Sequence, residues 1–270
     1  DSERSRGLGD VYKRQGPGKP FSIETIEDPT PQKGYAVAKV LACGSGLTIQ
    51  HVKAGRITVN YPRIIGHEII GEIVEINGHG GDLEIGTPVT AFFYLTCGHC
   101  RWCNIDRETL CDNFRGYIGR EIDGGYAEYI KLPIENFIKI PEEIDYKNNL
   151  LETAVVCDAV ATPLKIIKKA RISSFDKVGV IGAGGGLGIH MLKMLKLNNI
   201  SAIGIDTKTE KFNTCNENGA EFSVSPMEND LKNKIADFSK SNDLDVVIDF
   251  VSSKSSLELG CSILGKGGRL

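Results

Sequence analysis

Residues 177–188 read KVGVIGAGGGLG, and this stretch decides the fold of the second half of the chain. Lys177–Ile181 is an apolar, β-branched run of the kind found in buried strands, and 187–197 carries apolar residues at helical spacing. Glycines between a strand and a helix allow a tight turn and let a pyrophosphate approach the backbone N–H groups at the helix N-terminus. We therefore expect a dinucleotide-binding unit here.

The glycine loop supplies Gly182, Gly184, Gly185 and Gly188 as candidate cofactor-binding positions. The last glycine comes one residue late for the G-x-G-x-x-G pattern, so a simple turn is the alternative. Asp206 ends the next expected strand, where an acid accepts hydrogen bonds from the ribose hydroxyls of NAD and repels the 2′-phosphate of NADP. NAD is therefore the predicted cofactor. A helix N-cap is the alternative role for Asp206.

The expected secondary structure changes near residue 150, from short strands to alternating strands and helices. Before it, short β-like runs are expected at 36–41, 69–76, 87–93 and 127–132, broken by Gly, Pro and Asn. After it, strands are expected at 177–181, 200–205, 221–224 and 245–250, and helices at 156–170, 187–197, 209–218 and 229–238. This alternation predicts a parallel, doubly wound sheet. We expect an α/β protein with a β-rich domain at 16–150 and a cofactor domain at 151–270.

The two ends of the sequence call for separate interpretation. Residues 1–15 are polar and basic without an apolar centre, and we interpret them as a foreign or disordered leader outside the fold. Residues 267–270 form a turn that feeds a new strand, whereas a full sheet of this type has about six strands. We therefore expect a C-terminally truncated cofactor domain that binds NAD poorly, and weak or absent turnover.

Composition excludes several classes of protein. The 270 residues are 41% hydrophobic and 25% charged, with a formal net charge of −3, which predicts a globular protein with no nucleic-acid partner. No apolar run approaches the ~18 residues of a membrane span. Eight cysteines in a chain without a signal peptide indicate metal binding in a reducing compartment, so we expect a cytoplasmic protein.

Half of these cysteines fall within one short segment. Cys97, Cys100, Cys103 and Cys111 follow at spacings of three, three and eight, which allows four thiolates to surround one zinc ion tetrahedrally. A closed four-sulfur site leaves no room for substrate, so its role is structural. The alternatives are four unrelated core cysteines or an iron–sulfur cluster, but the ferredoxin pattern has a shorter last gap and a Pro where Asp112 stands.

A second set of ligand-type residues is scattered along the chain. Cys43, His67 and Asp158 offer a thiolate, an imidazole and a carboxylate, which makes a three-ligand zinc site with a fourth position open to substrate. Taken alone, His67 would more often be a structural histidine than a ligand.

The order of these features resembles the zinc-containing medium-chain alcohol dehydrogenases. Cys43, the histidine motif at 66–71, the four-cysteine loop and the glycine loop follow one another as in that family, over residues 16–270. The resemblance implies a GroES-like catalytic domain followed by a Rossmann domain. It further implies reversible hydride transfer between a small-molecule alcohol or carbonyl substrate and NAD, two zinc ions per chain (one catalytic, one structural), and a homodimer or homotetramer.

The resemblance also assigns roles to single residues. Cys43 and His67 look like the first two ligands of the catalytic zinc. Asp158 looks like the third, because it lies four residues before Thr162, which resembles the family's threonine beside the nicotinamide. Cys157 is the alternative third ligand.

Further roles follow by position. Glu68 is similar to the family's acid beside the zinc, and Ser45 to the hydroxyl that takes the alcohol's proton. Lys211 resembles the second ribose contact, and Phe93 a wall of the substrate pocket. The alternatives are a turn hydroxyl for Ser45, a solvated helix lysine for Lys211 and ordinary core packing for Phe93.

Two departures from the family pattern bear on the catalytic site. Gly46 stands where the family usually has an Asp that orients the zinc-binding histidine, and Thr48 stands where a proton-relay His is common. The alternative to an enzyme is therefore a non-catalytic paralogue that holds only the structural zinc. The substrate is open among primary and secondary alcohols, polyols and cyclic hydroxyacyl thioesters.

Overall fold

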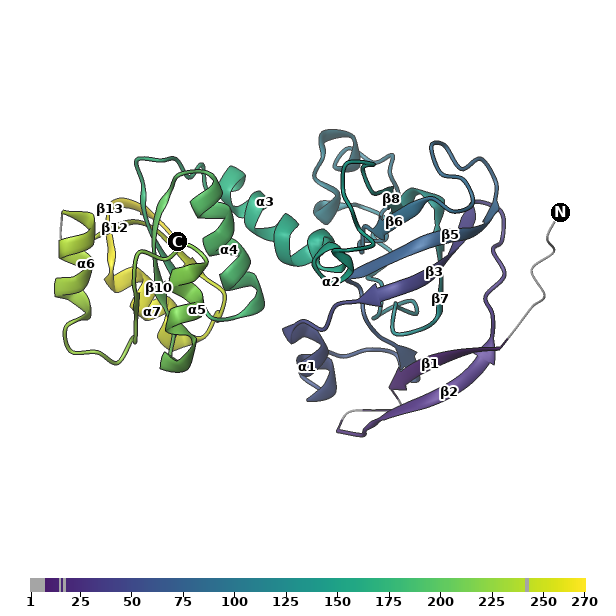
Figure 1. Ribbon diagram of the computed structural model, residues 1–270, viewed down its shortest axis with the longest axis horizontal. Helices are drawn as coiled ribbons and strands as arrows, with labels where there is room; N and C mark the ends of the chain where they lie inside the picture. Colours follow the sequence, from purple (N-terminus) through teal and green to yellow (C-terminus); the bar gives the residue numbers. More distant parts are fainter. Residues whose placement is uncertain (1–7, 15, 17, 241–242) are drawn as a thin grey trace. The chain divides into compact units, whose positions relative to one another are not determined.

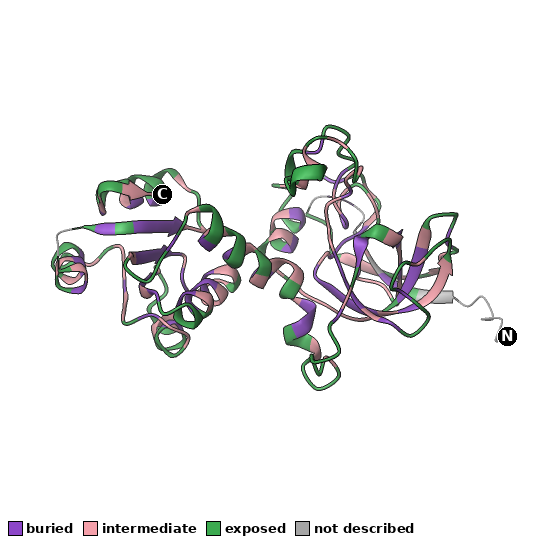
Figure 2. Cartoon of the chain, turned by 90° about the horizontal axis from the view of Figure 1, so that it is seen from above, coloured by how far each residue is buried: buried purple, intermediate pink, exposed green. Residues whose placement is uncertain are grey.

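The computed structural model describes residues 8–14, 16, 18–240 and 243–270. The chain divides into two compact units, one ending at Cys157 and the other beginning at Asp158 (Figure 1). Buried residues follow the strands of each unit (Figure 2), and each hydrophobic core cluster draws its residues from one unit only. Every helix among the described residues is too short or too polar to cross a bilayer.

An antiparallel five-stranded sheet forms the centre of the first unit. Its order is β7 (Tyr129–Pro133), β3 (Tyr35–Cys43), β5 (Ile69–Asn77), β6 (Pro88–Ala91) and β8 (Phe137–Lys139). The core on this sheet is built from β-branched and small residues, among them Ala38, Ile69 and Ile73. The register pairs Cys43 with Ile69, which places the thiol at the end of β3 beside the segment that carries His67 and Glu68.

A second, three-stranded sheet with the order β2-β1-β4 forms the N-terminal part of this unit. It comprises β1 (Leu8–Arg14), β2 (Phe21–Glu27) and β4 (Arg63–Ile64). β1 pairs with β2 along its whole length, and Val11 is buried. The expectation that 1–15 lies outside the fold is therefore wrong for 8–14, while residues 1–7 and 15 lie outside the described part.

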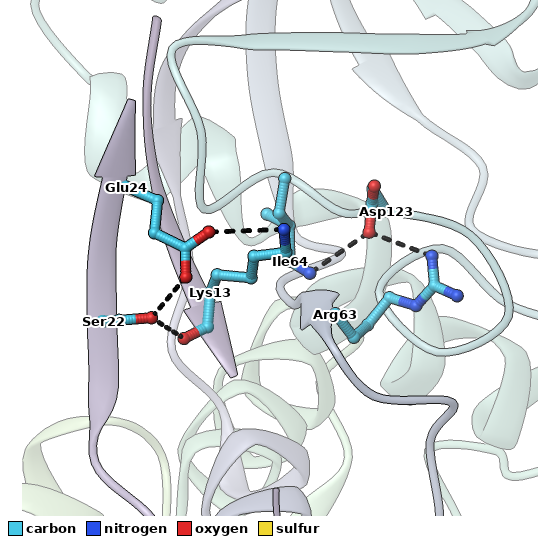
Figure 3. Close-up of polar contacts among 6 residues, drawn as sticks. All are labelled: Lys13, Ser22, Glu24, Arg63, Ile64 and Asp123. Carbon is cyan, nitrogen blue, oxygen red and sulfur yellow. Dashed lines mark hydrogen bonds and ion pairs between the residues drawn. The ribbon is translucent and has the colours of Figure 1, made fainter. Parts of the chain in front are cut away.

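Polar contacts join β1 to β2, and β4 to the loop that carries Asp123 (Figure 3). Lys13 forms an ion pair of 3.3 Å with Glu24 across the β1–β2 pair, and the Ser22 hydroxyl donates to the Lys13 carbonyl at 3.1 Å. The Asp123 carboxylate accepts from the Arg63 guanidinium at 2.9 Å and from the Ile64 N–H at 3.2 Å. The polar character that marked residues 1–15 as foreign is thus partly explained by cross-strand pairing.

Short helices complete the first unit. They are α1 (Leu47–Lys53), η1 (Cys103–Ile105), η2 (Glu108–Leu110), η3 (Ile134–Asn136) and α2 (Leu150–Ala154). α1 begins four residues after Cys43 and packs on the unit through Ile49 and Val52, which are buried. No helix was expected here, because seven residues are too few for a helical apolar period to stand out.

A parallel sheet forms the centre of the second unit. Its order is β11 (Ser223–Val224), β10 (Ser201–Ile205), β9 (Lys177–Ile181), β12 (Leu244–Asp249) and β13 (Leu264–Arg269). The strand order reverses at β9, so the carboxyl end of β9 is the topological switch point at which such sheets bind ligands. The predicted fold class, a GroES-like domain followed by a Rossmann-type sheet, is confirmed.

The helices of this unit follow the expected alternation, except that a helix over 254–262 was not among those expected and that the first helix begins differently. They are α3 (Ala161–Lys169), α4 (Gly186–Leu197), η5 (Thr209–Lys211), α5 (Phe212–Glu217), α6 (Leu231–Ser239) and α7 (Lys254–Ser262). The helix expected at 156–170 begins instead with a π-helical turn, η4 (Val156–Val160). Pro163 has no N–H to donate to the carbonyl of Ala159, which interrupts the α-helical pattern at this junction.

Candidate active site

The four-cysteine loop forms a compact sulfur cluster. Each Sγ lies within 4.8 Å of the other three, and the separations include 3.5 Å for Cys100–Cys103, 3.5 Å for Cys97–Cys111 and 3.9 Å for Cys100–Cys111. Zinc–sulfur bonds of about 2.3 Å in a tetrahedron put sulfurs about 3.8 Å apart. None of these cysteines is in a disulfide. The cluster therefore has the dimensions that a zinc ion requires.

Hydrogen bonds within the loop hold the sulfurs in place. The Cys97 N–H donates to Cys111 Sγ at 3.3 Å, and the Trp102 indole donates to Asp112 at 3.1 Å. A hydrogen bond from the backbone of His99 lowers the pKa of Cys97 to about 5, which favours its thiolate form. Burial raises the pKa of Cys103 to about 12. A cation in the centre would stabilise all four thiolates together.

Cys43 lies against the chain that leads into His67. A Cβ at Gly66 would come within 2.7 Å of Cys43 Sγ, and Gly66 has φ +98°, so glycine alone fits between them. Burial, together with the nearby Cys157 and Glu68, raises the pKa of the Cys43 thiol. The Cys157 thiol lies 3.7 Å from the carbonyl oxygen of His67. The first unit thus brings together Cys43, the His67 segment, Glu68 and Cys157.

Glu68 is a buried carboxylate, with 5% of its surface exposed. Its Oε2 would lie only 2.5 Å from a Cβ at Gly44 and 3.6 Å from a Cβ at Gly46. Gly44 is therefore required by this packing. The segment that lacks the family's Asp at position 46 has the Glu68 carboxylate beside it instead.

Tyr126 joins this group, and the sequence analysis missed it. Its hydroxyl donates to the Gly44 carbonyl at 3.4 Å. Burial raises the pKa of Tyr126, and a hydrogen bond with the Ser45 side chain partly offsets that effect. In the sequence, the glycine pair just before Tyr126 was the feature that could have pointed to it. A Cβ at Gly124 would lie 2.2 Å from the Gly66 carbonyl oxygen, so glycine lets this segment pass close to the chain that leads into His67.

Aromatic packing closes one side of His67. The rings of His67 and Phe93 have centroids 4.9 Å apart, and Phe93 packs in turn on Tyr94 at 4.8 Å.

The four-cysteine loop is the one set of three or more His, Cys, Asp or Glu in the described chain whose ligand atoms all lie within 4.8 Å. Cys43, His67 and Glu68 do not form such a set.

Asp158 and Thr162 belong to the second unit. Asp158 lies in the π-helical turn and Thr162 in the first turn of α3. The Thr162 hydroxyl donates to Asp158 Oδ1 at 2.9 Å, which fixes the orientation of the carboxylate. The spacing of four residues, read from the sequence as a family signature, thus corresponds to a direct hydrogen bond.

The glycine loop follows β9 and opens α4. Gly182 has φ +76°, and Gly185 is the N-cap of the helix. A Cβ at Gly188 would lie 2.3 Å from the Gly182 carbonyl oxygen, whereas a Cβ at Gly186 would meet nothing within 4 Å. The late glycine at 188 is therefore required for close packing of the loop on the helix, and the turn leaves open space over Gly186.

Asp206 and Lys211 are both held against this loop. Asp206 Oδ2 accepts from the Gly184 N–H at 2.8 Å, and its Oδ1 accepts from the Lys208 N–H at 2.9 Å. The Lys211 ammonium donates to the Gly184 carbonyl at 2.7 Å. The following helix has Lys208 as its N-cap. The carboxyl end of β9 thus presents a carboxylate, an ammonium and glycine backbone, which fits a ribose and a pyrophosphate.

Comparisons with known proteins bear on both units. Residues 32–142 match the alcohol dehydrogenase GroES-like domain, and residues 186–270 match the zinc-binding dehydrogenase domain. The chain belongs to the zinc-dependent medium-chain alcohol dehydrogenase family.

Individual relatives agree with this assignment. A NAD-dependent alcohol dehydrogenase of Sulfurisphaera tokodaii is 28% identical over 262 residues, covering 93% of this chain and 74% of the relative. The alcohol dehydrogenase of Aeropyrum pernix matches with a TM-score of 0.87 and 28% identity, covering 97% of this chain and 77% of that one. A cobalt- and zinc-bound thermostable alcohol dehydrogenase from Pyrobaculum aerophilum matches with a TM-score of 0.83 and 28% identity, over 97% and 76%.

Proposed function

We propose that this protein oxidises an alcohol to an aldehyde or ketone by reversible hydride transfer to NAD. The observation that carries the proposal is the combination in one chain of the zinc-sized sulfur cluster with a carboxylate-bearing glycine loop at the switch point of the second unit. The names of its relatives, NAD-dependent and zinc-bound alcohol dehydrogenases, support the same reaction.

We assign NAD rather than NADP to the glycine loop. The Asp206 carboxylate is oriented by two backbone N–H groups, so it stays in the loop as a fixed negative charge. A fixed carboxylate accepts from the ribose 2′- and 3′-hydroxyls and repels a 2′-phosphate. Lys211, bonded to the Gly184 carbonyl, lies where it can make a second ribose contact.

We assign Cys43, His67 and Asp158 to the catalytic zinc and the four-cysteine cluster to a structural zinc. The Asp158 carboxylate already has a side-chain donor in Thr162, as metal-binding carboxylates usually do. Cys157 is a weaker candidate, because its thiol is oriented toward the backbone carbonyls of His67 and Ala154.

Side chains of the protein would bind and orient the reactants, accept the proton and exclude water. A bound zinc ion supplies Lewis-acid chemistry that lowers the pKa of the alcohol. Ser45 Oγ would accept the alcohol's proton while its own hydroxyl proton passes on toward solvent, and the Tyr126 hydroxyl, hydrogen-bonded to Ser45, orients it. Phe93 excludes water beside His67. Thr162 positions the nicotinamide, and Glu68 supplies negative charge behind the ligands.

The finer properties are inferences of the same kind. We infer a homodimer or homotetramer, a small alcohol or carbonyl compound as substrate, and the cytoplasm as the location, where the cluster cysteines stay reduced.

Zinc analysis of variants tests this assignment. We expect about two zinc ions per chain in the wild type and about one in Asp158→Ala, because a three-ligand site that loses one ligand binds zinc weakly. The matched control, Cys157→Ala, should keep about two. NAD-dependent alcohol oxidation, followed by NADH absorbance, should be lost in Asp158→Ala alone. About one zinc ion in all three proteins would favour the non-catalytic paralogue.

A further inference from the structure

Asn136 is a buried polar side chain that no role assigned above uses, with 3% of its surface exposed. It lies at the end of η3, beside the last residue pair of the β6–β8 ladder. Its side-chain nitrogen donates to the Phe92 carbonyl at 2.6 Å and to the Tyr94 carbonyl at 2.9 Å. Its own backbone carbonyl accepts from the Phe92 N–H at 2.8 Å. Asn136 therefore holds the chain just after it leaves β6.

These contacts require an amide side chain at position 136. One NH2 group has two hydrogens, and here each carbonyl of the pair takes one of them. A carboxylate offers only acceptors and would repel both carbonyls. A leucine would fill a similar volume and donate to neither. The two hydrogen bonds therefore depend on the asparagine itself.

The residue between these two carbonyls is held by another segment. The Ile118 N–H donates to the Phe93 carbonyl at 3.0 Å, and the Leu95 N–H donates to the Gly116 carbonyl at 2.9 Å. The segment that contains Phe93 is thus bonded both to Asn136 and to 116–118. It cannot shift without breaking hydrogen bonds to one or the other.

This segment carries the ring that packs on His67. The Phe93 and His67 rings have centroids 4.9 Å apart and an interplanar angle of 52°. Phe93 also packs against the core cluster that contains Ile69, while the rings of Phe92 and Tyr94 stack on each other at 5.4 Å. Because its backbone is held and its ring is packed, Phe93 forms a rigid wall against the imidazole.

A rigid wall at His67 matters because of the residue at position 46. Gly46 has no carboxylate with which to orient the histidine, so other contacts have to do so. We propose that Asn136 is a positioning residue of the candidate active site. By holding the backbone at 92–94, it fixes Phe93 against His67 and sets the plane of the imidazole. The inference rests on the proposed function in one respect, the assignment of His67 to the catalytic zinc.

NMR of the His67 imidazole in the zinc-loaded protein tests the proposal, because an aromatic ring shifts the signals of protons that it packs against. The chain has five histidines, and His67→Gln assigns the signals of His67. We expect Asn136→Leu to shift these signals in the same direction as Phe93→Leu, which removes the ring. The matched control is Thr87→Val, which removes another buried hydrogen-bonding side chain of the first unit, the acceptor of the Glu84 N–H at 2.9 Å. It should leave the His67 signals unchanged.

Zinc affinity provides a second readout. Loss of a residue that orients a metal-binding histidine typically weakens metal binding about 10- to 100-fold. Competition with a chelator should show this loss for one of the two zinc ions in Asn136→Leu, and for neither in Thr87→Val. Thermal melting checks that the variants are folded. Should Asn136→Leu not fold, Asn136→Ser keeps one donor and should shift the His67 signals in the same direction by less.

The inference and the proposed function can fail separately. Unchanged His67 signals in Phe93→Leu, or in a folded Asn136 variant, would overturn the inference. Equal shifts in Asn136→Leu and Thr87→Val would also overturn it, because they would report a general loss of stability. A wild-type protein that holds one zinc ion would overturn the proposed catalytic zinc, while the His67 signals would still decide whether Asn136 positions the ring.

Discussion

Among single residues, Asp206 is the one that we propose selects the cofactor. Its two carboxylate oxygens accept from Gly184 and Lys208, so the side chain cannot swing away from an incoming ribose. Asp206→Asn keeps the shape but loses the charge, and hydrogen bonds to charged groups contribute about 1.5–3 kcal/mol. We expect KM for NAD to rise roughly 10- to 100-fold and the preference over NADP to shrink. Steady-state kinetics with both cofactors measure this.

The control for that experiment is Lys208→Ala. Only the backbone N–H of Lys208 bonds to Asp206, so this variant should leave KM for both cofactors unchanged. An unchanged NAD preference in Asp206→Asn would remove the ribose role of this residue.

Tyr146 gives a prediction about pH. Its hydroxyl donates to Glu72 at 2.6 Å, and this hydrogen bond, which the phenolate would lose, raises the pKa of Tyr146 to about 12. A pKa raised above the unfolded value of about 10 means that the folded state favours the neutral phenol. The stabilisation is complete below about pH 10 and is lost as the pH rises toward 12.

Urea unfolding at several pH values measures that effect. The free-energy difference between wild type and Tyr146→Phe should be constant from neutral pH to about pH 10 and should shrink above it. A difference that stays constant through about pH 11.5 would mean that Tyr146 does not titrate in this window.

At the scale of elements, the junction of β9 and α4 depends on one glycine. A Cβ at Gly188 would lie 2.3 Å from the Gly182 carbonyl oxygen and 2.6 Å from that of Ala183, both backbone atoms that cannot move aside. Gly188→Ala should cost about 1–3 kcal/mol of unfolding free energy through overpacking. Gly186→Ala is the control, because open space and helical position should make it neutral or stabilising by up to about 1 kcal/mol. Denaturant titrations of both variants compare the two; equal stabilities would contradict the packing argument.

Individual loops and strands also differ in how well they could be predicted from the sequence. The glycine loop and the cysteine loop were predictable, because each places its chemistry within a short segment where spacing alone constrains geometry. β1 was missed, because its strand character comes from pairing with β2 and is hidden under polar side chains. Tyr126 was missed for a related reason: its contacts with Gly44 and Ser45 join segments about 80 residues apart in the chain. Sequence spacing predicts local ligand sets well and gives little information about such distant pairs.

For the whole molecule, the presence of two units with separate cores predicts two separate responses to ligands. The clusters that contain Ile69 and Ile65 belong to the first unit, and those that contain Met191 and Ile203 to the second. The cysteine cluster lies in the first unit and the glycine loop in the second. A ligand stabilises the unit that binds it by RT ln(1 + [L]/Kd), about 2.7 kcal/mol at a hundredfold excess over Kd.

Hydrogen exchange followed by mass spectrometry can separate these responses. NAD should slow exchange in β9 and α4, because it binds the loop between them, and should leave β3 and β5 unchanged. A zinc chelator should speed exchange across 97–111 first, since a zinc ion there would bind all four cysteines of this loop. Glycine-loop peptides should then keep their NAD-dependent protection. Loss of that protection on chelation alone would show that cofactor binding depends on the zinc-holding unit, and the two units would have to be treated as one thermodynamic body.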